Sequence, residues 1–180
     1  MNIPASSIQR NKFSINCNGR LVDLNTPKIM GILNLTPDSF SDGGKFNNEK
    51  SALLHAEKLL KDGADFIDIG AQSTRPNAEY LSAEEEIRRI GNVISLIKKE
   101  FPEALISIDT FYADVVKFGY NEGMDVVNDI SGGYFDENLL PTVAETRLPY
   151  ILMHSNTSYA TMHEKIHYED ITMSVNYYFS

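Results

Sequence analysis

Strand-like and helical patterns alternate along this chain, and the alternation constrains the fold more than any other feature. Short apolar runs that suit buried strands occur at residues 29–35, 66–70, 105–109, 126–130 and 150–154. Between them, apolar residues recur at three- or four-residue steps, as on one face of a helix. Repeated strand–helix units require parallel strands with helices packed outside them, so the sequence predicts an α/β fold.

The clearest helical pattern puts four isoleucines on one stripe: Ile87, Ile90, Ile94 and Ile97. Charged residues fall on the opposite side, where we expect a solvated face: Glu84, Glu85, Arg88 and Lys98. This pattern predicts an amphipathic helix packed against the sheet.

Polar residues stand at the carboxyl end of each predicted strand. They are Asn34, the run 73–75, Asp109, Asn128 and His154. In a (β/α)8 TIM barrel all such ends face one mouth, where catalytic groups gather. An open doubly wound sheet is the alternative, with a crevice at its switch point. The recurrence of polar residues at every strand end favours the barrel.

Residues 13–24 read as a β-hairpin, because Asn18-Gly19 separates two alternating runs. We expect this hairpin to cap the amino-terminal end of the barrel within a single domain over residues 1–180. A closed barrel of this kind has eight βα units and about 250 residues. The chain supplies about five units, so we expect an incomplete barrel, roughly the first two thirds of a larger protein.

Composition limits the partners and the compartment. The net charge of -9 opposes binding to nucleic acid or to an anionic membrane. The single cysteine, Cys17, excludes an intrachain disulfide. No signal-peptide core and no apolar stretch of about 18 residues is present, so we expect a soluble cytoplasmic protein.

Five motifs make the sequence specific. They are ILNLTPDSFSDGG (32–44), DIGAQSTRP (68–76), SIDT (107–110), VNDISGG (127–133) and LMH (152–154). In this order they resemble the dihydropteroate synthase family of pterin-binding enzymes, from about residue 27 to the end. The resemblance implies a transferase of folate biosynthesis, the target of sulfonamides. Such an enzyme condenses (7,8-dihydropterin-6-yl)methyl diphosphate with 4-aminobenzoate to give 7,8-dihydropteroate and diphosphate.

That reaction requires the enzyme to hold a polyanionic leaving group and to shield positive charge on a methylene carbon. By resemblance Thr74 and Arg75 hold the diphosphate, as a hydroxyl and a planar guanidinium can. Asn34 resembles the family's ligand for Mg²⁺, which prefers hard oxygens; the alternative is an asparagine that only caps a strand. Asp42 and Arg75 are the predicted catalytic residues.

The resemblance assigns the two organic substrates to other residues. Asp109 and Asn128 resemble the pterin-binding pair, since a carboxylate and a carboxamide match the mixed donors and acceptors of a pterin edge. Met153 resembles an apolar residue against the pterin face. Two loops are expected to close over 4-aminobenzoate and carry Phe40, Ser41, Ser73 and Pro76.

Some positions depart from the family pattern or stay open. Gln72 stands where an acidic residue is common and receives no role, and Asn77 stands where the family has glycine. Asp68 and Asp129 lie beside motif positions, with structural and functional readings about equal. His163 to His167 match the zinc motif H-E-x-x-H, but the context of a long helix is lacking.

Two other classes of function compete with a synthase. One is a pterin-binding methyltransferase module that serves a corrinoid partner, and the other is an inactive pterin-binding fragment. The family's later strands carry further contacts to pterin and diphosphate, so we expect the 180-residue chain alone to be inactive. The resemblance also implies a homodimer for the full-length protein.

Overall fold

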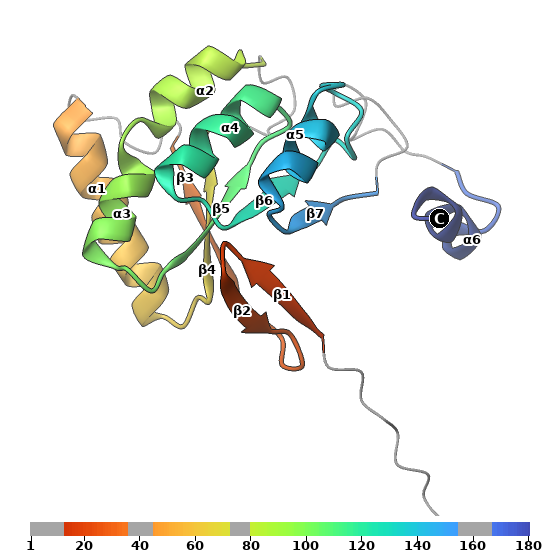
Figure 1. The fold of residues 1–180 in the computed structure, drawn as a ribbon, viewed down its shortest axis with the longest axis horizontal. Coiled ribbons are helices and arrows are strands. Elements are labelled where there is room, and N and C mark those ends of the chain that lie inside the picture. The colour runs from red at the N-terminus through yellow and green to blue at the C-terminus, as the bar shows by residue number, and fades with distance from the viewer. Residues whose placement is uncertain (1–12, 36–44, 73–79, 155–166) are drawn as a thin grey trace, which may run out of the picture.

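The computed structural model describes residues 13–35, 45–72, 80–154 and 167–180 and gives an α/β fold (Figure 1). The strands in these ranges are β1 (Ser14–Cys17), β2 (Arg20–Asp23), β3 (Met30–Asn34), β4 (Phe66–Gly70), β5 (Leu105–Asp109), β6 (Val126–Asp129) and β7 (Tyr150–Leu152). The helices are α1 (Lys45–Lys61), α2 (Ala83–Ile90), α3 (Val93–Glu100), α4 (Ala113–Glu122), α5 (Leu139–Thr146) and α6 (Ile171–Tyr178).

Strands β3 to β7 form one parallel sheet in sequence order, and helices α1 to α5 cover one of its faces (Figure 1). Alternate strand residues such as Leu33, Ile67 and Ile108 point to that face and are buried against the helices. The α/β class with successive parallel strands is confirmed. Among the described strands the barrel is incomplete, because β3 and β7 each pair with one neighbour only.

The other sheet face is the inner face of this incomplete barrel. Residues at the centre of this face are buried, such as Ser107 of β5 at 0% exposure. Residues at its edges are exposed: Ile32 of β3 by 60% and Ile151 of β7 by 41%. Unpaired sheet edges with exposed apolar side chains favour association with other chains, so both edges of this sheet are unprotected.

The isoleucine stripe of residues 87–97 belongs to two helices. Gly91 ends α2 with a φ of 50°, a left-handed value that suits glycine, and its N–H donates to Ile87 O. Helix α3 starts two residues later, and Ile90, Ile94 and Ile97 are still fully buried against the sheet. The apolar spacing therefore predicted the buried face correctly but not the break.

The carboxyl-terminal part differs more from the prediction. Strand β7 ends at Leu152 rather than at His154, and helix α6 has no buried residue. In Figure 1 α6 lies beyond the β7 edge instead of covering the sheet. The hydroxyl of Tyr178 connects α6 to the residues that follow β6 and β7, because it lies within donating distance of Gly132 O at 3.3 Å and Met153 O at 3.4 Å.

The hairpin β1–β2 packs under the amino-terminal ends of the strands, as predicted. Cys17 and Val22 contact Phe66, Leu105 and Val126, each the first residue of its strand. The described residues contain no helix long and apolar enough to cross a membrane.

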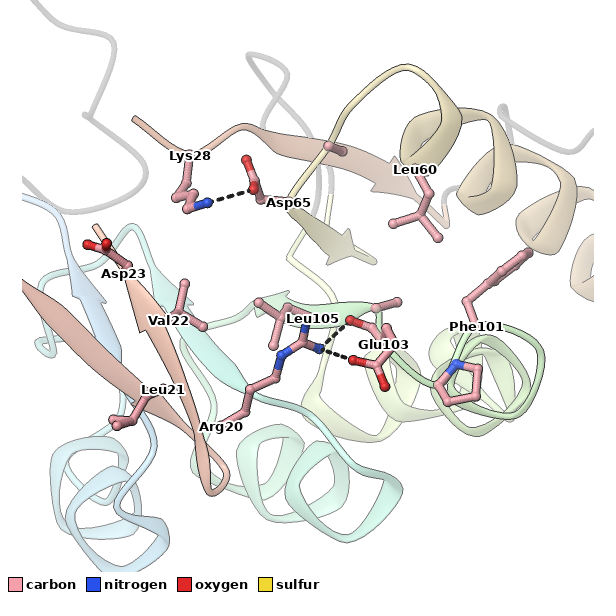
Figure 2. Close-up of a pocket in the computed structure, with 13 residues that line it drawn as sticks. Arg20, Leu21, Val22, Asp23, Lys28, Leu60, Asp65, Phe101, Glu103 and Leu105 are labelled. Atoms are coloured by element: carbon pink, nitrogen blue, oxygen red, sulfur yellow. Dashed lines mark hydrogen bonds and ion pairs between the residues drawn. The ribbon is translucent and has the colours of Figure 1, made fainter. Parts of the chain in front are cut away.

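A cavity of about 650 Å³ lies between the hairpin and the lower end of the sheet (Figure 2). Two ion pairs line it: Arg20 with Glu103 at 3.3 Å, and Lys28 with Asp65 at 3.0 Å. Asp65 and Glu103 precede β4 and β5, so this cavity is at the opposite end of the sheet from the polar strand ends. Each of its two cationic side chains is paired with a carboxylate, and the cavity belongs to the attachment of the hairpin.

Candidate active site

The register of the sheet brings the polar strand ends into one row. Asn34 pairs with Gly70, Gly70 with Asp109, Asp109 with Asn128, and Asn128 with Ile151. Residues in register point to the same face of a parallel sheet. Three of the predicted site residues, Asn34, Asp109 and Asn128, therefore lie side by side on the inner face.

Gly70 is the position in this row that has no side chain. A Cβ there would lie 3.3 Å from Asn34 Oδ1 and 3.8 Å from Asp109 Oδ2. The glycine therefore leaves a gap between the amide of Asn34 and the carboxyl of Asp109, and both groups border it. A polar ligand group placed in this gap would meet an amide oxygen on one side and a carboxyl on the other.

Asp109 sits in an environment that disfavours its charge. Burial raises the pKa of this carboxyl to about 7, and the nearby carboxyls of Asp68, Glu86 and Asp129 add to the rise. Near neutral pH the group is therefore present both as an acid, which can donate a hydrogen bond, and as a carboxylate, which only accepts. Such a group is a functional-site candidate when it faces a cleft or mouth.

Asp68, for which the sequence left two readings, contacts a site residue directly. Its Oδ2 accepts a hydrogen bond of 3.1 Å from Asn128 Nδ2, and the side chain is 7% exposed. The bond fixes which way the amide points, because Asn128 Oδ1 would be repelled by the carboxylate. Asn128 therefore keeps its oxygen available as an acceptor.

One row below, Asp68 is in register with Ser107. Within the described part of the chain, Asp68 Oδ1 and Ser107 Oγ are buried polar atoms that have no hydrogen-bond partner. Buried polar atoms are usually paired, so these two mark a polar floor beneath the candidate site.

Asp129 has a structural role in this geometry. It is fully buried, and its carboxylate accepts from Ser131 N at 2.6 Å, Gly133 N at 2.7 Å and the Tyr150 hydroxyl at 2.5 Å. Three donors on one carboxylate hold the turn after β6. The burial of Tyr150 and its hydrogen bond to Asp129 raise the pKa of that phenol.

Of the two residues after β7, Met153 continues beside the end of β6, whereas His154 does not lie with the row. Met153 is half-buried, and its N–H donates to Asp129 O at 3.3 Å. His154 packs its ring edge-on against Tyr178 at 4.8 Å between centroids, among the aromatic residues of the carboxyl-terminal segment. Among the described polar strand ends, His154 is thus tied to α6 rather than to the other site residues.

Several predicted site residues lie outside the described residues: Phe40, Ser41, Asp42, Ser73, Thr74, Arg75 and Pro76. Asn77 and the first four positions of the zinc-like motif, His163 to Ile166, also lie outside them. Residues 36–44 follow β3 and residues 73–79 follow β4. The ends of these two strands are adjacent, because Leu35 N donates to Gly70 O at 2.8 Å.

Sequence reasoning missed Glu86. It lies on α2 with 0% exposure and accepts hydrogen bonds from Gln72 and Thr110, residues just after β4 and β5. Burial raises the pKa of its carboxyl to about 7, although both hydrogen bonds act to lower it. The signal was its spacing, because Glu86 precedes the buried Ile90 by one turn of α2 and so shares its buried face.

The parallel βα sheet carries a carboxyl and two amides in one row at the carboxyl ends of its strands. This is the place where (β/α)8-barrel enzymes have their active sites. Residues 30–180 match the family described as pterin binding enzyme, and the chain belongs to this family.

The similar proteins are named for folate synthesis or as dihydropteroate synthases. The chain is 44% identical to a mitochondrial folate synthesis bifunctional protein of Arabidopsis thaliana over 84% of its own length and 28% of that protein. It is 42% identical to the dihydropteroate synthase of Haemophilus influenzae, over 88% of this chain and 57% of that one. The chain thus spans little more than half of this bacterial relative.

A solved structure agrees with the fold. The dihydropteroate synthase of Xanthomonas albilineans with 4-aminobenzoic acid superposes with a TM-score of 0.82 at 35% identity, over 94% of this chain and 59% of that one. The predicted family is therefore confirmed.

Proposed function

We propose that the chain provides the pterin side of a dihydropteroate synthase. The reaction joins the exocyclic carbon of (7,8-dihydropterin-6-yl)methyl diphosphate to the amino nitrogen of 4-aminobenzoate. The carbon–oxygen bond breaks with its electron pair leaving on diphosphate, a carbon–nitrogen bond forms, and the amine loses a proton. The observation that carries the proposal is the row of Asn34, Asp109 and Asn128 in a member of the pterin-binding family.

The row suits a pterin edge. Asn128 offers an oxygen acceptor, because its nitrogen is engaged by Asp68. Asp109 offers either a donor or an acceptor, because its pKa is close to neutral. A pterin presents both N–H donors and ring-nitrogen acceptors along one edge, so this pair can satisfy either kind of atom. In the proposal Met153 packs against the ring.

The remaining roles rest on the sequence motifs. Thr74 and Arg75 hold the diphosphate, and Arg75 with Asp42 acts at the reacting centre. Phe40, Ser41, Ser73 and Pro76 form the place for 4-aminobenzoate, where sulfonamides would also bind. Asn34 Oδ1 borders the gap at Gly70 and suits Mg²⁺ as one hard oxygen ligand. When bound there, the ion would offset negative charge on the leaving diphosphate.

Compartment and assembly are part of the proposal. A cytoplasmic location is supported by the one cysteine, Cys17, which is a free buried thiol as in reducing compartments. The proposed substrates are small molecules, and a homodimer is proposed for the full-length protein on family resemblance alone.

Calorimetry with the pterin diphosphate, with and without Mg²⁺, tests the proposed function. We expect binding by the unaltered chain to strengthen with Mg²⁺, and Asn34→Ala to abolish this increase. Asn121→Ala is the matched control, since Asn121 is exposed on α4. Binding that Mg²⁺ does not strengthen would count against a synthase and would favour the methyltransferase class, which has no diphosphate to hold.

A further inference from the structure

A buried carboxyl connects the helix layer to the two strand ends of the candidate site. Glu86 is the residue, and it lies on the face of α2 that packs onto the sheet with 0% exposure. A carboxyl at such a position loses its hydration, and this loss costs several kcal/mol unless other groups replace the water. A leucine would fill the same place without that cost, so the carboxyl calls for an explanation.

Both oxygens of Glu86 have a partner. Oε1 accepts from Gln72 Nε2 at 2.5 Å, and Oε2 accepts from Thr110 Oγ1 at 2.8 Å. Gln72 follows Gly70 of β4 by two residues, and Thr110 directly follows Asp109 of β5. One side chain from the outer layer thus joins the carboxyl ends of two neighbouring strands.

Gln72 extends this connection to the chain that returns towards α2. Its Oε1 accepts from Leu81 N at 3.2 Å, and its Nε2 also donates to Leu81 O at 3.1 Å. This two-way contact joins a residue that follows β4 to the segment just before α2, as a pair of bonds between two backbone segments would.

The β5 side is held in the same way. Thr110 Oγ1 accepts from Tyr112 N at 3.2 Å, so its own hydrogen is free to point at Glu86. The Tyr112 hydroxyl donates to Leu81 O at 2.8 Å. Gln72, Leu81, Glu86, Thr110 and Tyr112 together form one connected set, which we call the clamp.

We propose that Glu86 is a positioning residue for pterin diphosphate binding, which acts through Gln72 and Thr110 to fix the ends of β4 and β5 relative to each other. The inference rests on the proposed function. Asp109, next to Thr110, is the proposed pterin contact, and Gln72 stands two residues before Thr74, a proposed diphosphate contact, in the sequence. Buried polar networks of this kind select one arrangement of the backbone when every member is satisfied.

Replacement of Glu86 by leucine separates a positioning role from a purely structural one. The first lowers ligand affinity, and the second lowers stability. Glu86→Leu keeps the apolar packing of α2 and removes the desolvation cost of a buried carboxyl, which offsets the loss of its two hydrogen bonds, so stability should change little. Gln72 Nε2 and Thr110 Oγ1 lose their shared acceptor, and the two strand ends become free to shift. We therefore expect ligand binding to weaken without loss of stability.

The test measures affinity for the pterin diphosphate with Mg²⁺ by calorimetry, together with urea unfolding. We expect Glu86→Leu to weaken binding about tenfold or more, which corresponds to 1.4 kcal/mol or more. Glu86→Gln keeps an oxygen for Gln72 and should stay within about threefold of the unaltered chain. The matched control is Glu84→Leu on the exposed side of α2, which should leave affinity unchanged.

A second readout follows the clamp without ligand. Hydrogen exchange at the amides of Leu81 and Tyr112 should accelerate in Glu86→Leu and not in Glu84→Leu, since both N–H groups bond to clamp side chains. If Glu86→Leu does not fold, Thr110→Val removes a single hydroxyl and should give the same loss of affinity.

The possible failures are distinguishable. No binding by the unaltered chain overturns the proposed function, and the inference with it. Binding by the unaltered chain that Glu86→Leu leaves unchanged overturns the inference alone. A fall in affinity that only matches a fall in stability, with no rescue by Glu86→Gln, also overturns it, because the residue would then be structural.

Discussion

Asn128 on β6 donates its Nδ2 hydrogen to Asp68 Oδ2 on β4 across 3.1 Å, in front of the intervening strand β5. Asp109 of β5 is the carboxyl most affected by this arrangement, because Asp68 contributes the largest charge effect to its raised pKa after burial itself. One buried carboxylate therefore sets both the direction of the amide and the protonation of the neighbouring acid. The two predicted pterin contacts are controlled from the row beneath them.

Asp68→Asn should lower the pKa of Asp109 towards its ordinary value. The neutral amide removes the charge that opposes ionisation of Asp109, while its oxygen can still accept from Asn128. Carbon-13 NMR titration of the side-chain carboxyl measures the change. Asp114→Asn, on the exposed surface of α4, is the control and should leave the titration where it was. An Asp109 pKa that does not move in Asp68→Asn would contradict the proposed coupling.

The stability of the chain should fall as pH rises from about 4 to about 7. The pKa values of Asp109 and Glu86 are both about 7 in the folded protein, above their ordinary values of 3.8 and 4.5. In this window the unfolded chain releases protons that the folded chain retains, so each step up in pH lowers the free energy of the unfolded state relative to the folded state. Below and above this pH window, these two groups do not change the free energy of unfolding as pH changes.

Asp109→Asn removes one of the two groups. Each retained proton contributes a slope of about 1.4 kcal/mol per pH unit, so the variant should lose up to that much of the decline. Urea unfolding at several pH values between 4 and 8 measures it. A slope identical to that of the unaltered chain would show that the Asp109 carboxyl titrates normally.

The fold was largely accessible to sequence reasoning because the signals are local. Strands β4 and β5 are short runs rich in isoleucine, and their predicted limits match the structure. The hairpin follows from Asn18-Gly19, both of which have the positive φ that such a turn requires. The break at Gly91 was not accessible, because the isoleucine spacing continues across it and only the backbone changes.

Within the candidate site, the sequence could predict only the residues at strand ends. Parallel register puts Asn34, Asp109 and Asn128 in one row, so their proximity follows from the strand assignment alone. Glu86 and Asp68 were missed or left open because their roles depend on partners in other elements: Glu86 contacts a residue 24 positions away, and Asp68 one 60 positions away. Periodicity reports burial but does not identify such partners.

Gly70→Ala should weaken Mg²⁺-dependent ligand binding while changing stability little. The added methyl group would stand 3.3 Å from Asn34 Oδ1, closer than most Cβ contacts, and would fill the gap between Asn34 and Asp109. Gly70 does not have a positive φ, so alanine causes no backbone strain. We expect about a tenfold loss of affinity, or 1.4 kcal/mol, by calorimetry. Unchanged affinity would place the ligand away from this gap.

The 180-residue chain should bind the pterin diphosphate but form negligible dihydropteroate. The inner face is open at both edges, with Ile32 60% and Ile151 41% exposed, so water reaches the row of polar strand ends, whereas the proposed reaction needs a shielded cation. Formation of labelled dihydropteroate from labelled 4-aminobenzoate measures turnover, and calorimetry on the same sample measures binding. Turnover within the range of ordinary enzymes, about 1–10³ per second, would contradict this prediction.

Asp129→Ala should destabilise the chain by about 3 kcal/mol, because a buried carboxylate with several donors is removed and the donors are left unpaired. Ser131 N, Gly133 N and the Tyr150 hydroxyl all lose their acceptor. Asp129→Asn keeps one oxygen acceptor and should cost less. Asp114→Ala, an exposed aspartate on α4, is the matched control.

Urea unfolding gives the free energy of each variant, and hydrogen exchange at Ser131 and Gly133 locates the effect. Both amides should exchange faster in Asp129→Ala than in the unaltered chain, while the amide of Ile106, held by Asp125 at 2.7 Å, should not. Because Asp129 follows Asn128 directly, release of this turn should also loosen the Asn128 amide, the proposed pterin contact. Loss of stability below about 0.5 kcal/mol, the size of an ordinary surface substitution, would mean that the turn is held by other contacts.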